Sequence, residues 1–168
     1  VIDDFLPSNQ IRHIQDSLIG VKSRFPWNYN GDPIWGRDPE STKSFQFTQI
    51  VYDARPNTNP FSDAFPLVEP CLMKLGAQSL RRVKANLTTK TLFHRNEGWH
   101  TDYPPSSLIL KTAILYINTN NGYTKFKNGT KVKSVENRMV VFPSHLMHQG
   151  YTCSDQLKRV VVNFNYDK

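Results

Sequence analysis

The sequence predicts a mostly β protein in which N-terminal helices precede a β-sandwich or jelly roll. From about residue 80 onward, short apolar or alternating segments recur at regular spacing between Gly and Asn turns. Before that point, two segments have the 3.6-residue periodicity of amphipathic helices. The chain has 168 residues, which suits one domain with its own core. We expect residues 1–79 to form helices and loops that pack on a β core at residues 80–166.

The first helix is predicted over residues 8–20, because Ile11, Ile14 and Leu18 lie at i, i+3 and i+7 and share one face. A second helix is predicted from Leu67 to Gly76, where the apolar residues again share a face. The intervening segment is rich in Pro, Gly, Asn and Trp and is expected to be ordered loop or edge strand over residues 23–42.

The strands are predicted from apolar, β-branched or alternating runs. They cover residues 45–52, 83–87, 112–118, 123–126, 130–135, 139–142 and 160–164. The pair Asn128-Gly129 predicts a tight hairpin between two of these strands.

The composition and charge exclude several classes of protein. Hydrophobic residues make up 38% and charged residues 21%, which rules out a disordered, collagen-like or coiled-coil chain. No apolar run approaches the roughly 20 residues of a membrane span, and no secretory signal is visible, so we expect a cytoplasmic protein. The spacing of Cys71 and Cys153 predicts neither a disulfide scaffold nor a thiolate zinc site. The oligomeric state stays open.

The net charge of +7 is concentrated in the second half of the chain. Residues 85–168 contain eleven Lys and Arg against five Asp and Glu. Such a balance suits an anionic small molecule, an acidic peptide or nucleic acid, or it serves solubility alone. Four lysines share odd positions around the predicted hairpin and form either a solvated face or a docking surface: Lys125, Lys127, Lys131 and Lys133.

One set of polar residues has the pattern of a metal centre. His100 and Asp102 lie at i and i+2, so on a strand both side chains point to the same face. A third ligand must come from a distant strand, and both His148 and His145 are available there. Two imidazoles and one carboxylate leave three coordination positions open, an arrangement typical of non-haem Fe(II) oxygenases.

Arg159 begins an apolar strand-like run eleven residues after His148. An inward guanidinium at this position can bind a carboxylate with two parallel hydrogen bonds. Tyr116, in another predicted strand, can donate a hydroxyl hydrogen bond to the same carboxylate.

Taken together, these residues resemble the Fe(II)/2-oxoglutarate-dependent dioxygenases, in particular the prolyl 4-hydroxylase-like branch and its small stand-alone members in bacterial and phage genomes. The similarity covers roughly residues 80–166. Two positions depart from the family pattern: Tyr123 stands where many relatives have Gly, and Arg159 where many hydroxylases have Lys. The motifs that carry the resemblance are His100-x-Asp102, Thr112-x-x-x-Tyr116-Ile117-Asn118, Asn121-Gly122-Tyr123-Thr124-x-Phe126, Arg138-x-Val140-Val141-Phe142-Pro143-Ser144, His148-x-Gly150 and Arg159.

The resemblance implies a double-stranded β-helix with N-terminal helices packed on one sheet. It assigns His100, Asp102 and His148 as iron ligands, and the family spacing favours His148 over His145. It assigns Arg159 to the far carboxylate of 2-oxoglutarate, with Tyr116 as a helper. Asn163 lies on the same strand face as Arg159 and is assigned to the cosubstrate or to a water near the metal.

The function implied is hydroxylation of a C–H bond with Fe(II), 2-oxoglutarate and O2, releasing succinate and CO2, with ascorbate as reductant. The leading substrate is a prolyl or other residue in a peptide or protein. The alternatives are a nucleobase or small metabolite, which the basic second half permits, and a non-catalytic cupin-like metal-binding module. Trp99 and Tyr103 either pack locally or form an aromatic wall for the substrate, while His13 and His94 are expected at the surface.

Overall fold

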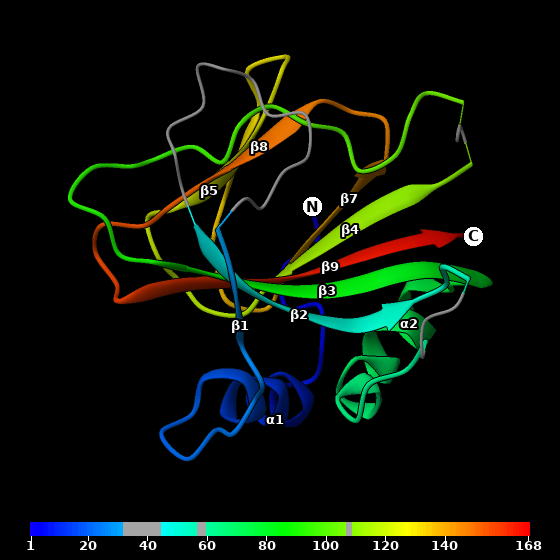
Figure 1. Ribbon diagram of the computed structural model, residues 1–168, viewed down its shortest axis with the longest axis horizontal. Helices are drawn as coiled ribbons and strands as arrows, with labels where there is room; N and C mark the ends of the chain where they lie inside the picture. Colours follow the sequence, from blue (N-terminus) through cyan, green and yellow to red (C-terminus); the bar gives the residue numbers. More distant parts are fainter. Residues whose placement is uncertain (32–44, 57–59, 107–108) are drawn as a thin grey trace.

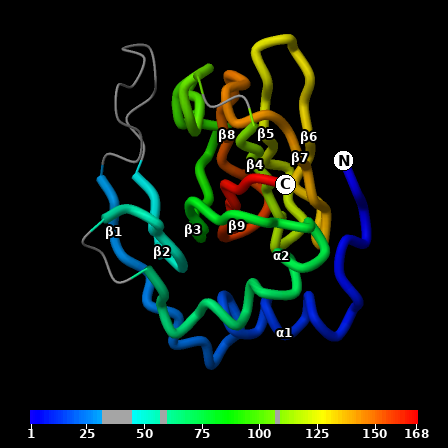
Figure 2. Tube along the Cα trace, turned by 90° about the vertical axis from the view of Figure 1, so that its right-hand side faces the viewer, coloured from blue at the N-terminus to red at the C-terminus, as the bar shows by residue number. Residues whose placement is uncertain are grey.

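The computed structural model describes residues 1–31, 45–56, 60–106 and 109–168. These residues form a large antiparallel sheet with a smaller sheet over one face and helices over the other (Figure 1). A view turned by 90° shows the same three layers, with α1 and α2 on the side away from β5 and β8 (Figure 2). In these ranges no helix is long and apolar enough to span a membrane.

The helices are short and precede most of the strands. They are α1 (Ser8–Ile19), the 3-10 helix η1 (Phe65–Leu67) and α2 (Glu69–Leu75). The strands are β1 (Asn28–Asn30), β2 (Gln46–Asp53), β3 (Ser79–Thr89), β4 (Lys111–Tyr116), β5 (Tyr123–Phe126), β6 (Lys131–Lys133), β7 (Arg138–Pro143), β8 (His148–Tyr151) and β9 (Lys158–Asp167).

The strand order is that of a jelly roll. The larger sheet has the order β1-β2-β3-β9-β4-β7 and the smaller one β6-β5-β8, and every neighbouring pair is antiparallel. From β4 onward the chain passes repeatedly between the two sheets, with β4, β7 and β9 in the larger one and β5, β6 and β8 in the smaller one, as in a double-stranded β-helix. The structure thus confirms the predicted fold class, and β1 and β2 extend the larger sheet with residues from the N-terminal segment.

The outer face of the larger sheet packs against the helices. Ile11, Ile14 and Leu18 of α1 are buried against it, as their spacing predicts. Alternate residues of the central strands complete this core, because neighbours in a strand point to opposite faces. They are Val83 and Ala85 of β3, Ala113 and Leu115 of β4, and Val160, Val162 and Phe164 of β9.

The inner face of the same strands has a different character. A small apolar cluster that includes Phe126, Val132 and Phe142 fills one part of the space between the sheets. Polar side chains lie beside this cluster, and the strand register places polar and apolar residues together in rows across β3, β9 and β4. The rows are Arg82, Asn165 and Thr112; Lys84, Asn163 and Ile114; Asn86, Val161 and Tyr116; and finally Thr88 and Arg159.

Several strands differ in extent from the sequence prediction. β3 covers eleven residues where five were expected, because its polar ends also pair with β9 although they lack the apolar alternation that predicts a strand. β1 lies in the segment predicted as loop or edge strand over residues 23–42, of which residues 32–42 fall outside the described ranges. β8 was not predicted, because His148-Gln149-Gly150-Tyr151 lacks both apolar alternation and β-branched residues.

The core between helices and sheet should dominate stability. Phe164 has no exposed surface, whereas Phe93 is 76% exposed. We expect Phe164→Ala to lower the free energy of unfolding by about 3–5 kcal/mol, since it leaves a cavity under the helices. The matched control Phe93→Ala should change it by about 0.5 kcal/mol or less. Urea denaturation measures both, and equal losses would contradict this assignment of the core.

Candidate metal centre

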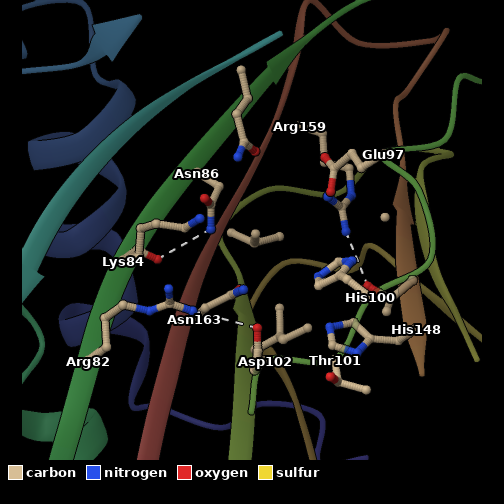
Figure 3. A pocket seen from close by; sticks show the side chains of 15 residues that line it. Arg82, Lys84, Asn86, Glu97, His100, Thr101, Asp102, His148, Arg159 and Asn163 are labelled. Atoms are coloured by element: carbon tan, nitrogen blue, oxygen red, sulfur yellow. Dashed lines mark hydrogen bonds and ion pairs between the residues drawn. The ribbon is translucent and has the colours of Figure 1, made fainter. Parts of the chain in front are cut away.

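His100, Asp102 and His148 converge in the space between the sheets (Figure 3). One ligand atom from each of them lies within 4.8 Å of the other two. A backbone bridge joins the two histidines: the His100 N–H donates to the His148 carbonyl at 3.0 Å, and the His148 N–H donates to the His100 carbonyl at 2.9 Å. This bridge places the imidazoles side by side, with ring centroids 4.4 Å apart.

Backbone carbonyls orient both imidazoles. Nδ1 of His100 lies 3.1 Å from the Gly98 oxygen, and Nδ1 of His148 lies 2.9 Å from the Leu146 oxygen. A carbonyl oxygen only accepts, so Nδ1 carries the hydrogen in each ring and Nε2 keeps its lone pair. Such contacts fix the tautomer of metal-binding histidines in general. The two Nε2 atoms are therefore the ligand atoms that these rings offer.

Hydrogen bonds from the larger sheet hold the Asp102 carboxylate in place. Its Oδ2 accepts from the Thr112 hydroxyl at 2.6 Å and from Nδ2 of Asn165 at 3.0 Å. Its Oδ1 lies 3.6 Å from Nη2 of Arg82. The donors come from β4, β9 and β3 and form one row of the inner face, so the sheet itself fixes the acidic ligand.

Electrostatics give the ligands the protonation states that a metal requires. Burial raises the pKa of Asp102, but His148, His100, the Thr112 hydroxyl and Arg82 outweigh it, so the pKa lies below its usual value. Burial, and then the charge of His100, lower the pKa of His148, although Asp102 opposes them. Asp102 is therefore ionised and His148 neutral near pH 7, as divalent metal binding demands.

The donor set fits a first-row divalent ion. Two imidazole nitrogens and one carboxylate oxygen are ligands suited to iron, and three ligands leave room for further ones in an octahedral site. His145, the other histidine of the same loop, is not part of this group. Of the two alternatives, the structure brings only His148 to His100 and Asp102.

A cavity of about 240 Å³ adjoins the three ligands. Arg159 and Asn163 line it, and Arg159 is only 4% exposed. The Arg159 guanidinium donates from Nε to the Ser134 hydroxyl at 2.9 Å and from Nη2 to the Thr124 hydroxyl at 3.2 Å. Both partners are neutral, and in the described part of the chain Arg159 forms no ion pair.

Tyr116 lies behind the cavity wall instead of in it. It is fully buried, donates its hydroxyl hydrogen to Thr124 at 2.8 Å, and packs its ring under the Arg159 guanidinium at 5.6 Å. It therefore supports Thr124 and Arg159, and both of these residues line the cavity. In this geometry Tyr116 reaches the cavity only through these two neighbours.

The two aromatic residues beside the metal ligands do not line the cavity. Trp99 packs under the Lys127 ammonium at 4.9 Å, on the lysine-bearing face of the β5–β6 hairpin. Burial raises the pKa of the Tyr103 hydroxyl, which is half-buried beside Arg82 and Asp102. His94 and His13 are exposed, as expected.

Five residues of this site were not singled out from the sequence: Arg82, Lys84, Glu97, Thr112 and Asn165. Arg82 and Lys84 alternate with the core residues of β3, and this pattern is also that of an ordinary half-exposed strand. They become site residues because the smaller sheet covers the inner face of β3, and the sequence pattern of β3 does not reveal this. Thr112 only begins the run that contains Tyr116, and Asn165 lies in none of the motifs. The sequence assigns neither residue a role, because both act through Asp102.

Comparison of the sequence with protein-family models and with curated proteins gives no match. Comparison of the structure does. A prolyl hydroxylase from Trichoplax adhaerens, in complex with a hypoxia inducible factor peptide fragment, is similar with a TM-score of 0.65 and 11% identity, over 99% of this chain and 82% of that one. The fold is that of the prolyl hydroxylases.

Two bacterial proteins are similar as well. A 2OG-Fe(II) oxygenase family protein from Burkholderia pseudomallei gives a TM-score of 0.64 at 11% identity, over 99% of this chain and 83% of that one. A prolyl-4-hydroxylase from Pseudomonas putida gives 0.55 at 15% identity, over 99% and 91%. These likenesses confirm, at the level of the fold, the resemblance that the motifs predict.

The hydrogen bond from Thr112 to Asp102 should contribute to metal affinity. We expect Thr112→Val to weaken Mn(II) binding by about tenfold, since loss of such an outer contact typically has an effect of this size. Thr130→Val, in the exposed hairpin turn, is the matched control and should bind as the wild type does. Isothermal titration calorimetry gives the three dissociation constants. Unchanged affinity in Thr112→Val would show that this hydrogen bond contributes nothing to metal binding.

Proposed function

We propose that the protein is an Fe(II)- and 2-oxoglutarate-dependent dioxygenase that hydroxylates a C–H bond of its substrate and releases succinate and CO2. One observation carries the proposal: two imidazoles and a carboxylate converge beside a cavity that also contains a buried guanidinium. The fold shared with prolyl hydroxylases supports it. His100, Asp102 and His148 would hold the iron through Nε2, a carboxylate oxygen and Nε2.

Arg159 supports the assignment of an anionic cosubstrate. Burial of a cation without a counter-ion is unfavourable in free energy, because the charge loses its hydration. The hydroxyl groups and the aromatic ring that contact the Arg159 guanidinium replace only part of that hydration. A carboxylate that enters the cavity would restore the missing charge. In our proposal Arg159 therefore fixes the far carboxylate of 2-oxoglutarate, and the Thr124 hydroxyl lies beside it.

The bound iron would supply the oxidative chemistry with O2, and ascorbate would keep the metal reduced. This chain contributes orientation and exclusion of water. Arg159 sets the position of the cosubstrate from one end. Ile114 and Val161 place apolar surface along the cavity, which limits the access of water to the reacting atoms. Asn163, whose buried Oδ1 has no partner among the described residues, offers an amide to a water near the metal when no substrate is bound.

The substrate that we favour is a prolyl or other residue of a peptide or protein. The similar structure from Trichoplax adhaerens has a peptide fragment bound, which supports a substrate of this class. A nucleobase or a small metabolite would use the same chemistry. No Phe, Tyr or Trp side chain lines the cavity in the described residues, and the two histidines that line it are the candidate metal ligands, which favours the peptide over a flipped base.

The proposal is tested by succinate formation without added substrate. Wild-type protein with Fe(II), ascorbate and 2-oxoglutarate should produce succinate, and His100→Ala should reduce the rate at least about 100-fold because the iron is lost. Arg159→Gln should raise the KM for 2-oxoglutarate by about tenfold or more, since a charge-assisted contact is removed. His94→Ala removes an exposed histidine outside the cavity and serves as the control.

Two results would contradict the proposed activity or the proposed role of Arg159. Equal metal binding by His100→Ala and wild type, together with no succinate from either protein, would leave a metal-binding module without turnover. An unchanged KM in Arg159→Gln would remove Arg159 from the cosubstrate site.

A further inference from the structure

β3 forms one wall of the cavity, and this wall contains two cationic side chains. Neither of them has been assigned to the iron or to 2-oxoglutarate in the proposed function. Arg82 and Lys84 lie at alternate positions of β3, so both point inward, and both line the cavity (Figure 3). Arg82 is partly neutralised, because Nη2 lies 3.6 Å from Asp102 and Nε donates to Asn165 at 3.3 Å. Lys84 has no such partner in the part of the chain that the structure describes.

Lys84 is an ammonium group without an acceptor. Among the described residues none accepts a hydrogen bond from its Nζ, and it forms no ion pair. Burial, and then the neighbouring charge of Arg82, lower its pKa, while the charges of Asp102 and Glu97 act in the opposite direction. A partly buried cation beside a second cation is unfavourable in the free protein. An anion placed between the two would relieve both costs.

Two side-chain amides beside Lys84 also have unsatisfied hydrogen-bonding capacity among the described residues. Asn163 is the register partner of Lys84 on β9, and Asn86 follows two residues later on β3. The Oδ1 atom of each is buried and has no hydrogen-bond partner. A side-chain amide can turn to present either its oxygen or its NH2 group. These two amides can therefore donate to a bound anion.

The wall that contains Lys84 and Asn163 lies at a different place in the cavity from Arg159. Arg159 and Asn163 are four residues apart on β9, which corresponds to about 13 Å along the strand. The two positions also lie in separate rows, since Arg159 pairs with Thr88 and Asn163 with Lys84. A cosubstrate held by Arg159 thus leaves the Lys84 end of the cavity to another molecule.

The opposite side of the cavity has the opposite charge. Glu97 lines it, and its carboxylate lies against Gly150, where an added Cβ would come within 2.4 Å of Oε2. Gly150 therefore makes room for this carboxylate beside β8. Glu97 would repel an anion and attract an N–H or ammonium group, so the two walls orient a ligand that has both kinds of group.

We infer that Arg82, Lys84, Asn86 and Asn163 form a subsite for a carboxylate of the primary substrate. The inference rests on the proposed function, because it gives the substrate of that same site a charge. The carboxylate comes either from an acidic side chain next to the oxidised residue of a peptide or from a free amino acid. Both sources share the chemistry that the subsite recognises, and the experiment below separates them.

The experiment measures binding to the purified protein without added metal or 2-oxoglutarate. One probe pair is acetyl-Ala-Pro-Glu-Ala-amide and its Gln counterpart, and the other is L-glutamate and L-glutamine. In at least one pair the carboxylate member should bind about tenfold tighter to the wild type. Lys84→Met should reduce this ratio to about one, and Lys84→Arg, which keeps the charge, should retain a preference.

Lys133→Met is the matched control, because it removes an exposed lysine of the hairpin and should leave the ratio unchanged. A preference in the peptide pair assigns the subsite to acidic peptides, and one in the other pair alone assigns it to free amino acids. No preference in the wild type, or a preference that survives in Lys84→Met, overturns the inference. So does a tenfold rise in the KM for 2-oxoglutarate in Lys84→Met, which would place the cosubstrate there.

The two proposals fail separately. Absence of succinate from the wild type would contradict the oxygenase while the binding ratios still decide the subsite. Normal succinate formation with equal binding of both probe members would retain the oxygenase and remove the subsite.

Discussion

The backbone bridge between His100 and His148 is the contact on which the rest of the site depends. It joins the loop before β4 to β8, two segments almost fifty residues apart in the chain, through two short hydrogen bonds. Because paired residues of an antiparallel bridge have side chains on the same side, the bridge sets both imidazoles toward one point. Two further carbonyls then fix the tautomers. A metal centre follows from ordinary strand pairing, without any strained local geometry.

The larger sheet contributes the other charged side chains of the site, and the register of its strands places them in successive rows. One row holds Asp102 through Thr112, Asn165 and Arg82, the next presents Lys84 and Asn163, and the last contains Arg159. The helices pack on the far face of these same strands. The rigid core therefore supports the polar rows directly, so that a substrate and a cosubstrate would bind to a preformed surface instead of ordering it.

The sequence predicts the metal centre better than it predicts the cavity around it. His100 and Asp102 are adjacent on one face, and His148 and Arg159 lie in motifs with recognisable spacing, so chemistry and order along the chain identify them. Arg82 and Lys84 differ: their alternation on β3 is that of any half-exposed strand, and their role depends on β8, a strand too polar to predict. Tyr116 was predicted as a cosubstrate contact, but its hydroxyl reaches Thr124, a packing detail that no spacing rule contains.

The central claim is that the three side chains bind one iron ion between the sheets. Anomalous scattering at the iron edge, from crystals grown anaerobically with Fe(II), tests it most directly. The account predicts a single strong peak within bonding distance of Nε2 of His100, Nε2 of His148 and a carboxylate oxygen of Asp102. A peak elsewhere on the protein, or these three side chains directed away from one another, would contradict it.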